Sequence, residues 1–239
     1  MAMNATVHTD ICNRLISIDH IKKHLVSVIW YGSASSGQDL HIRSDCDLQI
    51  VLDKPDFLST VALNTILEDY PHVDLSIVYL KDISYRDGTI IFQNGTKGLF
   101  FLYILANGKA IYGENIYKSM IESLAIEEIK SSLAFTIREY LSRLRIMATH
   151  NPNDTFRFKK YSLKLLKDLL IYSGSVELDK IVSLNYTQTL LCSLKFFNFC
   201  PESNTIIGDI LFFDKNYTKN DMANLLCDYE DIVEKILHE

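Results

Sequence analysis

Two aspartates separated by one residue stand at the entrance to an apolar run and could hold a divalent cation. They are Asp45 and Asp47 in the stretch DCDLQIVLD, in which residues 48–52 have strand composition. Alternate residues of a strand project from the same face, so we expect the two carboxylates to lie side by side. Like charges at such a separation repel unless a cation offsets them, and Mg²⁺ or Mn²⁺ prefers oxygen ligands of this kind. The pair therefore predicts a metal site.

A third carboxylate, Asp74, lies in a second apolar run over residues 72–80. A helical pattern over residues 57–67 separates this run from the first, which predicts a β-α-β unit around the acidic pair. If the two strands are neighbours, Asp74 converges with Asp45 and Asp47 on one or two metals. Such a cluster clamps the attacking and leaving oxygens in phosphoryl or nucleotidyl transfer. We therefore expect these three aspartates to be both the metal ligands and the catalytic acids.

A glycine and a serine end the apolar run that precedes the acidic pair. Gly32 and Ser33 follow residues 28–31, and a polar loop begins directly after them. Glycine lets a backbone approach an anion closely, and the amides of the turn and the serine hydroxyl can donate to a terminal phosphate. We expect Gly32 and Ser33 to bind the phosphates of a nucleotide.

The string WYGSASSGQDLHIRSDCDLQIV resembles the signature of the DNA polymerase β-like nucleotidyltransferase superfamily. That signature is an apolar residue, glycine and a small residue, then a loop, two acids separated by one apolar residue, and a third acid on a later strand. Residues 31–33, residues 45–48 and Asp74 fill the pattern in order. The segment ILANGKAIYGE, residues 104–114, is similar to the piece that follows the third acid in small members.

The resemblance implies a fold and a reaction. The fold is α+β, with a small mixed sheet and flanking helices over residues 1–114, followed by an all-helical bundle over residues 115–239. The layout of the second half resembles the C-terminal bundles of bacterial aminoglycoside and lincosamide nucleotidyltransferases. The implied reaction is Mg²⁺-dependent transfer of a nucleoside monophosphate from a triphosphate, with ATP favoured, to an acceptor hydroxyl. Further helices are expected at residues 10–25, 99–107, 122–149, 155–172, 183–197 and 219–237.

The sequence departs from the family pattern at Ser36. Many minimal members have arginine there, so the triphosphate needs cations from elsewhere. The helical segment 155–172 places Lys160, Lys164 and Lys167 on one face. We expect Lys160 and Lys164 to contact the phosphates, while a plain solvated face is the alternative interpretation.

Two acids are candidates for the general base that takes the proton from the acceptor hydroxyl. Asp74 is one candidate and Glu139, in the helical half, is the other. Arginines beside Glu139 favour a surface ion-pair network as its alternative role.

Composition excludes several classes of protein. The net charge of -6 argues against general nucleic-acid binding. The five cysteines form no C-x-x-C pair, which argues against a zinc site or a disulfide framework. No apolar run is long enough to predict a membrane span, so the cytoplasm is the expected location. Nothing in the sequence indicates the oligomeric state.

Several acceptors fit the same core. A small molecule such as an antibiotic is favoured, because an acidic protein tolerates cationic substrates. A protein- or RNA-modifying nucleotidyltransferase of the toxin-antitoxin type and a nucleotide second-messenger synthase are the enzymatic alternatives. A nucleotide-binding module without activity is the non-enzymatic one.

Overall fold

The structure is a computed structural model of the chain, and it divides into two compact units at Ile129 and Lys130. The boundary falls near the start of a helix. The sequence analysis places the boundary between the catalytic and helical domains after residue 114, and that boundary stays a prediction. The described residues are 7–32, 46–70, 73–86, 89–92, 95–122, 124–177, 184–212 and 215–238.

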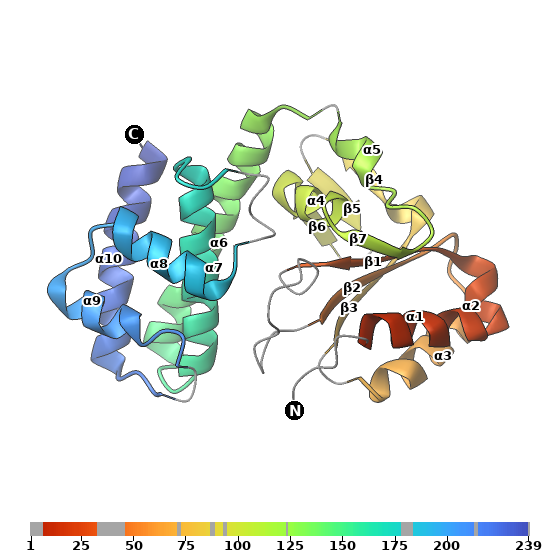
Figure 1. Cartoon of the computed structure of the whole chain (residues 1–239), viewed down its shortest axis with the longest axis horizontal. Coiled ribbons are helices and arrows are strands. Elements are labelled where there is room, and N and C mark those ends of the chain that lie inside the picture. Colours follow the sequence, from red (N-terminus) through yellow and green to blue (C-terminus); the bar gives the residue numbers. More distant parts are fainter. Residues whose placement is uncertain are drawn as a thin grey trace. The chain divides into compact units, whose positions relative to one another are not determined.

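A four-stranded mixed sheet organises the first unit, with strand order β3-β2-β1-β7 (Figure 1). The central strands β1 and β2 are antiparallel, β2 and β3 are parallel, and β7 pairs with β1 in the antiparallel sense. The parallel pair requires a crossover, and helix α3 (Phe57–Glu68) supplies it, as expected for a β-α-β unit. The strands are β1 (Leu25–Tyr31), β2 (Cys46–Leu52), β3 (Val73–Tyr79) and β7 (Lys109–Tyr112).

Apolar side chains cover both faces of this sheet, which explains why β2 reads as a continuous apolar run. On one face, Leu48 and Ile50 pack with residues of α1, α2 and α3. On the other face, Ile29 and Val51 pack with residues of α4. Figure 1 shows α1 and α3 on one side of the strands and α4 on the other. The helices are α1 (Val7–Ser17), α2 (Asp19–His24), α3 (Phe57–Glu68), α4 (Leu99–Ala106) and α5 (Lys118–Ile121).

A small antiparallel sheet lies between β3 and α4 in the chain. Its order is β4-β5-β6, and the sequence analysis did not predict it. A short 3-10 helix, η2, precedes it. The elements are η2 (Leu80–Asp82), β4 (Ser84–Arg86), β5 (Thr89–Phe92) and β6 (Gly95–Gly98).

All regular secondary structure among the described residues of the second unit is helical. The Asp154 side chain accepts a hydrogen bond from the Arg157 amide and begins α7, and Asn185 forms a capping box with Gln188 at the start of α8. The expected helices over residues 155–172 and 219–237 are present, and α9 was not predicted. The helices are α6 (Ile126–His150), α7 (Thr155–Tyr172), α8 (Tyr186–Phe196), α9 (Pro201–Gly208) and α10 (Lys219–His238).

None of the helices among the described residues combines the length and apolar character required to cross a membrane.

Candidate active site

Two of the three predicted acids lie side by side in the sheet. Asp47 on β2 is in register with Asp74 on the parallel neighbour β3, and with Tyr31 on the antiparallel neighbour β1. Paired residues of adjacent strands project from the same face, and neighbouring strands lie about 5 Å apart. The rung Tyr31–Asp47–Asp74 therefore brings two carboxylates to one end of β2. Asp47 is half-buried and Asp74 is exposed, so an ion can reach both.

Gly32 lies directly against the first of these carboxylates. Its φ is +76°, a left-handed conformation that glycine adopts without the steric cost of a side chain. A Cβ atom at this position would come within 2.1 Å of Asp47 Oδ2. The turn after β1 and the carboxylate of β2 are thus packed together, and any side chain at position 32 would have to displace the Asp47 carboxylate.

Burial and the acids together change the titration of neighbouring groups. Burial first, and then the charges of Asp47 and Asp74, raise the pKa of the Tyr31 phenol, so that Tyr31 is neutral and can donate a hydrogen bond. Cys46 lies on the opposite face of β2, where burial and the Asp47 charge raise its pKa to about 12. Both groups are therefore uncharged at neutral pH, and neither supplies a cation to the acids.

Several predicted site residues lie outside the described residues. These are Asp45, Ser33 and the loop with Ser36, so the structure leaves the side-by-side projection of Asp45 and Asp47 and the phosphate role of Ser33 as predictions. In the described part of the chain, no group of three or more His, Cys, Asp or Glu residues could hold a metal ion. The two acids that are described fit a hard divalent cation by the chemistry of their donors, since both offer carboxylate oxygens.

A buried amide lies on the same face of β2, two residues further into the sheet. Gln49 is fully buried, and within the described part of the chain neither its Nε2 nor its Oε1 has a hydrogen-bond partner. The hydroxyl of Tyr117, which packs in the same cluster as Tyr31, is also buried and has no hydrogen-bond partner among the described residues. An unmade hydrogen bond of this kind costs about 1–3 kcal/mol. Sequence reasoning missed both residues, although a glutamine within an apolar run was a visible signal.

The predicted lysine face of α7 is half-buried, in contrast to a plain solvated face. Lys160, Lys164 and Lys167 are each partly covered. The Lys164 ammonium lies 6.0 Å from the ring centroids of both Tyr140 and Tyr161. Lys167 donates to the Leu184 carbonyl at 3.1 Å, and burial lowers its pKa to about 8. Lys164 therefore belongs to an organised cluster on α6 and α7, and its phosphate role stays a prediction.

An acid that the sequence analysis did not single out lies beside these lysines. Asp168 is 5% exposed, and its Oδ2 has no partner among the described residues. Burial raises its pKa to about 8 against the opposing charges of Lys167 and Lys164. Asp168 is thus largely protonated at neutral pH.

Glu139, the alternative base, is held by an arginine. Arg143 Nε and Nη2 donate to Glu139 Oε1 at 3.1 and 2.5 Å, and Nη1 donates to the Tyr161 hydroxyl at 2.8 Å. This is the ion pair that the alternative interpretation predicted.

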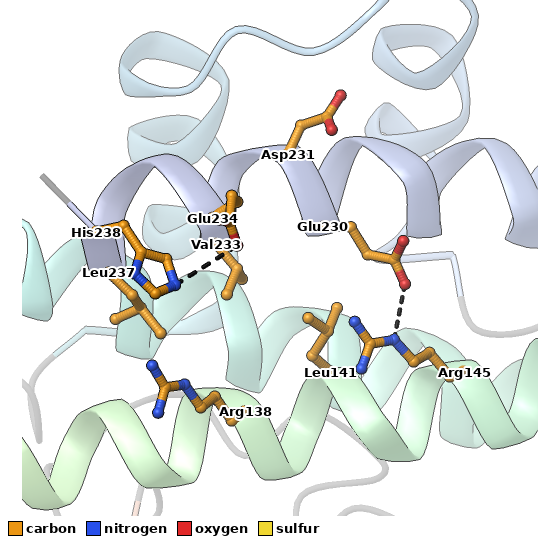
Figure 2. A pocket seen from close by; sticks show the side chains of 9 residues that line it. All are labelled: Arg138, Leu141, Arg145, Glu230, Asp231, Val233, Glu234, Leu237 and His238. Carbon is orange, nitrogen blue, oxygen red and sulfur yellow. Dashed lines mark hydrogen bonds and ion pairs between the residues drawn. The ribbon is translucent and has the colours of Figure 1, made fainter.

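A groove of about 480 Å³ lies between α6 and α10 in the second unit (Figure 2). Arg145 Nε donates to Glu230 Oε1 at 2.7 Å, and His238 Nε2 lies 3.5 Å from Glu234 Oε2. None of the predicted site residues lines it. Its lining residues are Arg138, Leu141, Arg145, Glu230, Asp231, Val233, Glu234, Leu237 and His238.

One solved structure shares this architecture over almost the whole chain. It is the spectinomycin adenyltransferase AAD(9) from Enterococcus faecialis, solved with ATP and spectinomycin. The similarity has a TM-score of 0.67 at 13% sequence identity and covers 98% of this chain and 100% of that chain. No protein-family model and no curated protein sequence matches the chain. The chain therefore has the fold of a small bacterial nucleotidyltransferase with a helical domain, which confirms the predicted fold class and, at the level of the fold, the resemblance.

Proposed function

We propose that this protein transfers a nucleoside monophosphate, AMP from ATP, to a hydroxyl group of a small-molecule acceptor. The observation that carries the proposal is the pairing of Asp47 with Asp74 on adjacent strands. Gly32 packs directly against Asp47, and the fold is shared with an adenyltransferase. Two carboxylates at one end of a sheet, beside a glycine turn, suit the binding of a cation and a phosphate. The protein would act in the cytoplasm.

Each predicted site residue receives a role in this proposal. Asp45 and Asp47 hold Mg²⁺, with Mn²⁺ as an alternative, and Asp74 completes the acidic group. The bound cation would offset the negative charge of the triphosphate and polarise its α-phosphorus. Gly32 and Ser33 cradle the terminal phosphates through backbone amides and the serine hydroxyl, while Lys160 and Lys164 neutralise phosphate charge.

The reaction exchanges one phosphorus–oxygen bond for another. The acceptor hydroxyl oxygen attacks the α-phosphorus, the bond to the bridging oxygen of the β-phosphate breaks, and pyrophosphate leaves. The hydroxyl proton passes to a base, for which we propose Asp74 over Glu139. The exposed Asp74 lies next to Asp47, whereas Glu139 is bound by the Arg143 guanidinium.

A small-molecule acceptor is the favoured class for two reasons. The neighbouring structure was solved with spectinomycin, and the net charge of -6 suits a cationic acceptor better than a nucleic acid. The class is proposed for this chain, and the acceptor itself is to be found by experiment.

The test is a product screen with the full-length protein. Each labelled nucleoside triphosphate is incubated with Mg²⁺ and, separately, with panels of small molecules, proteins and tRNA. We expect labelled AMP on a small hydroxyl compound, together with pyrophosphate. Label on protein or tRNA would show that the acceptor is a macromolecule instead of a small molecule. Nucleotide products formed from triphosphate alone would identify a second-messenger synthase. Absence of any product in every panel, with tight ATP binding, would leave a nucleotide-binding module.

Binding measurements test the metal separately from the acceptor. A triphosphate adds negative charge beside Asp47 and Asp74, so it should bind weakly without a divalent cation. Calorimetry is expected to show ATP binding strengthened by Mg²⁺ and lost in chelator. Equal affinity under the two conditions would contradict a metal site at these acids.

A further inference from the structure

The buried amide of Gln49 lies next to the acidic rung of the sheet. Gln49 pairs with Ile29 on β1 and with Ser76 on β3, and the Tyr31–Asp47–Asp74 rung lies two residues away, as the next rung on the same face of the sheet. Residues two apart on a strand project from the same face, with about 6–7 Å between them. The Gln49 side chain therefore leaves the middle of β2 on the same face as Asp47, as its neighbour on that face.

This amide lies in surroundings that otherwise suit an apolar residue. Residues of its own face, Ile29 and Val51, belong to the core against α4, and Gln49 itself is 0% exposed. Neither polar atom of its amide is hydrogen-bonded within the described part of the chain. A leucine or methionine there would fill a similar volume without a desolvated polar group. The fold alone gives no reason for a glutamine at this position.

An unsatisfied buried donor indicates a partner that is acquired in another state of the site. The carboxylate of Asp47 is the nearest charged acceptor along the same face of β2, and a glutamine amide can reach it directly or through one water. The buried Tyr117 hydroxyl and the Tyr31 phenol belong to the same cluster, so this side of the acids offers donors rather than further charge.

We propose that Gln49 is a positioning residue for the proposed metal site. Its Nε2 group donates a hydrogen bond to the Asp47 carboxylate, directly or through one buried water, when the cation and triphosphate are bound. The bond fixes the carboxylate so that its other oxygen is directed toward the cation. Partners behind metal ligands commonly change metal affinity by about 10- to 100-fold when they are removed. This inference rests on the proposed function, because it requires a cation at Asp47.

The test compares Gln49→Met with the unchanged protein. Methionine keeps the length of the side chain and removes both hydrogen-bonding groups. Mn²⁺ binding is measured by electron paramagnetic resonance, with and without a non-hydrolysable triphosphate, and unfolding is followed in urea. We expect the Mn²⁺ dissociation constant to rise about tenfold, which is about 1.4 kcal/mol, with the midpoint of unfolding unchanged or higher.

A second variant and two controls separate the outcomes. Gln49→Leu tests whether the effect follows the loss of the amide rather than the shape of methionine. Ser193→Ala removes another buried hydroxyl that lacks a partner in the described part of the chain, on α8, and should leave Mn²⁺ binding unchanged. Asp47→Asn should abolish Mn²⁺ binding.

Each result has one meaning. Weakened Mn²⁺ binding in both Gln49 variants, with stability retained, supports the proposal. Mn²⁺ binding like that of the unchanged protein, or a large loss of stability in both variants, overturns it, because the amide then has no role or a structural one. If the unchanged protein itself binds no Mn²⁺ with triphosphate, the proposed function fails and this inference fails with it.

Discussion

Aspartates in the two units of this chain lie in opposite environments. Asp47 and Asp74 stand at the accessible end of a sheet, in register on adjacent strands. Asp168 is buried on α7 beside Lys164 and Lys167, and its pKa is raised to about 8. Burial penalises the charged form of a carboxyl group, whereas an accessible pair can meet a cation. The two environments differ in access: Asp47 and Asp74 are accessible to solvent, whereas burial favours the protonated form of Asp168.

The largest expected effect is a loss of activity when one of the accessible aspartates is replaced. Replacing Asp47 by asparagine should lower nucleotidyl transfer by roughly 1,000-fold, about 4 kcal/mol, because a metal ligand is lost. The unfolding free energy should be unchanged or higher, because one of two adjacent like charges is removed. Steady-state kinetics and urea unfolding measure the two quantities. Glu202→Gln, on α9 of the helical unit, is the control and should change neither; a large loss of stability in Asp47→Asn would indicate a structural hydrogen-bonding role.

The buried side of the comparison predicts a pH dependence of stability. The pKa of Asp168 is higher in the folded protein than in the unfolded chain, so between about pH 4 and pH 8 the folded state holds a proton that the unfolded state has released. Stability should fall as pH rises through this window, by up to about 1.4 kcal/mol per pH unit. The neighbouring charges are those of Lys164 and Lys167, and Tyr140 lies close to the same carboxyl.

Asp168→Asn should remove that slope and make the protein more stable at pH 8 than the unchanged chain. Urea unfolding at several pH values between 5 and 8 checks this. Asp231→Asn, at an exposed position of α10, should retain the slope. Parallel profiles for Asp168→Asn and the unchanged protein would show that Asp168 is charged when folded.

Two glycines with positive φ, one in each unit, differ in the contact that an added Cβ atom would make. Gly32 and Gly174 have φ of +76° and +74°, but a Cβ at Gly32 would meet Asp47 whereas one at Gly174 would meet nothing within 4 Å. Gly174→Ala should cost about 1 kcal/mol from the backbone conformation alone. Gly32→Ala should cost about 2–3 kcal/mol and reduce transfer, because the carboxylate must also move. Equal costs and full activity would show that the contact at Asp47 is easily relieved.

The smallest expected effect concerns the proposed link between the helical unit and the nucleotide. Lys164→Glu should raise the triphosphate dissociation constant about tenfold, or 1.4 kcal/mol, as expected for a lost charge-assisted contact. Lys195→Glu, an exposed lysine on α8, makes the same change of charge and should have little effect because salt screens it. Calorimetry at ordinary ionic strength measures both. If Lys164→Glu binds ATP as tightly as the unchanged protein does, Lys164 does not contact the triphosphate and its role on α7 is structural.

The sequence by itself determined the β-α-β unit around the acidic pair. Strand composition over residues 48–52 and 72–80, with a helical period between them, is a local signal, and β2, α3 and β3 lie where it predicted. Helical periodicity likewise located α7 and α10. The small sheet β4-β5-β6 was missed because its strands are short and their pairing is not a local property.

Only the tertiary structure decided which polar groups share an environment. That Asp47 faces Asp74 is a matter of register between strands that are distant in the chain, and no periodicity within either strand specifies it. The burial of Gln49 depends on α4 covering one face of the sheet, and the raised pKa of Asp168 depends on how completely its neighbours exclude water. Residue type and spacing thus identified Asp47 and Asp74, while packing determined that these two are accessible and that the carboxyl of Asp168, which the pattern did not single out, is buried.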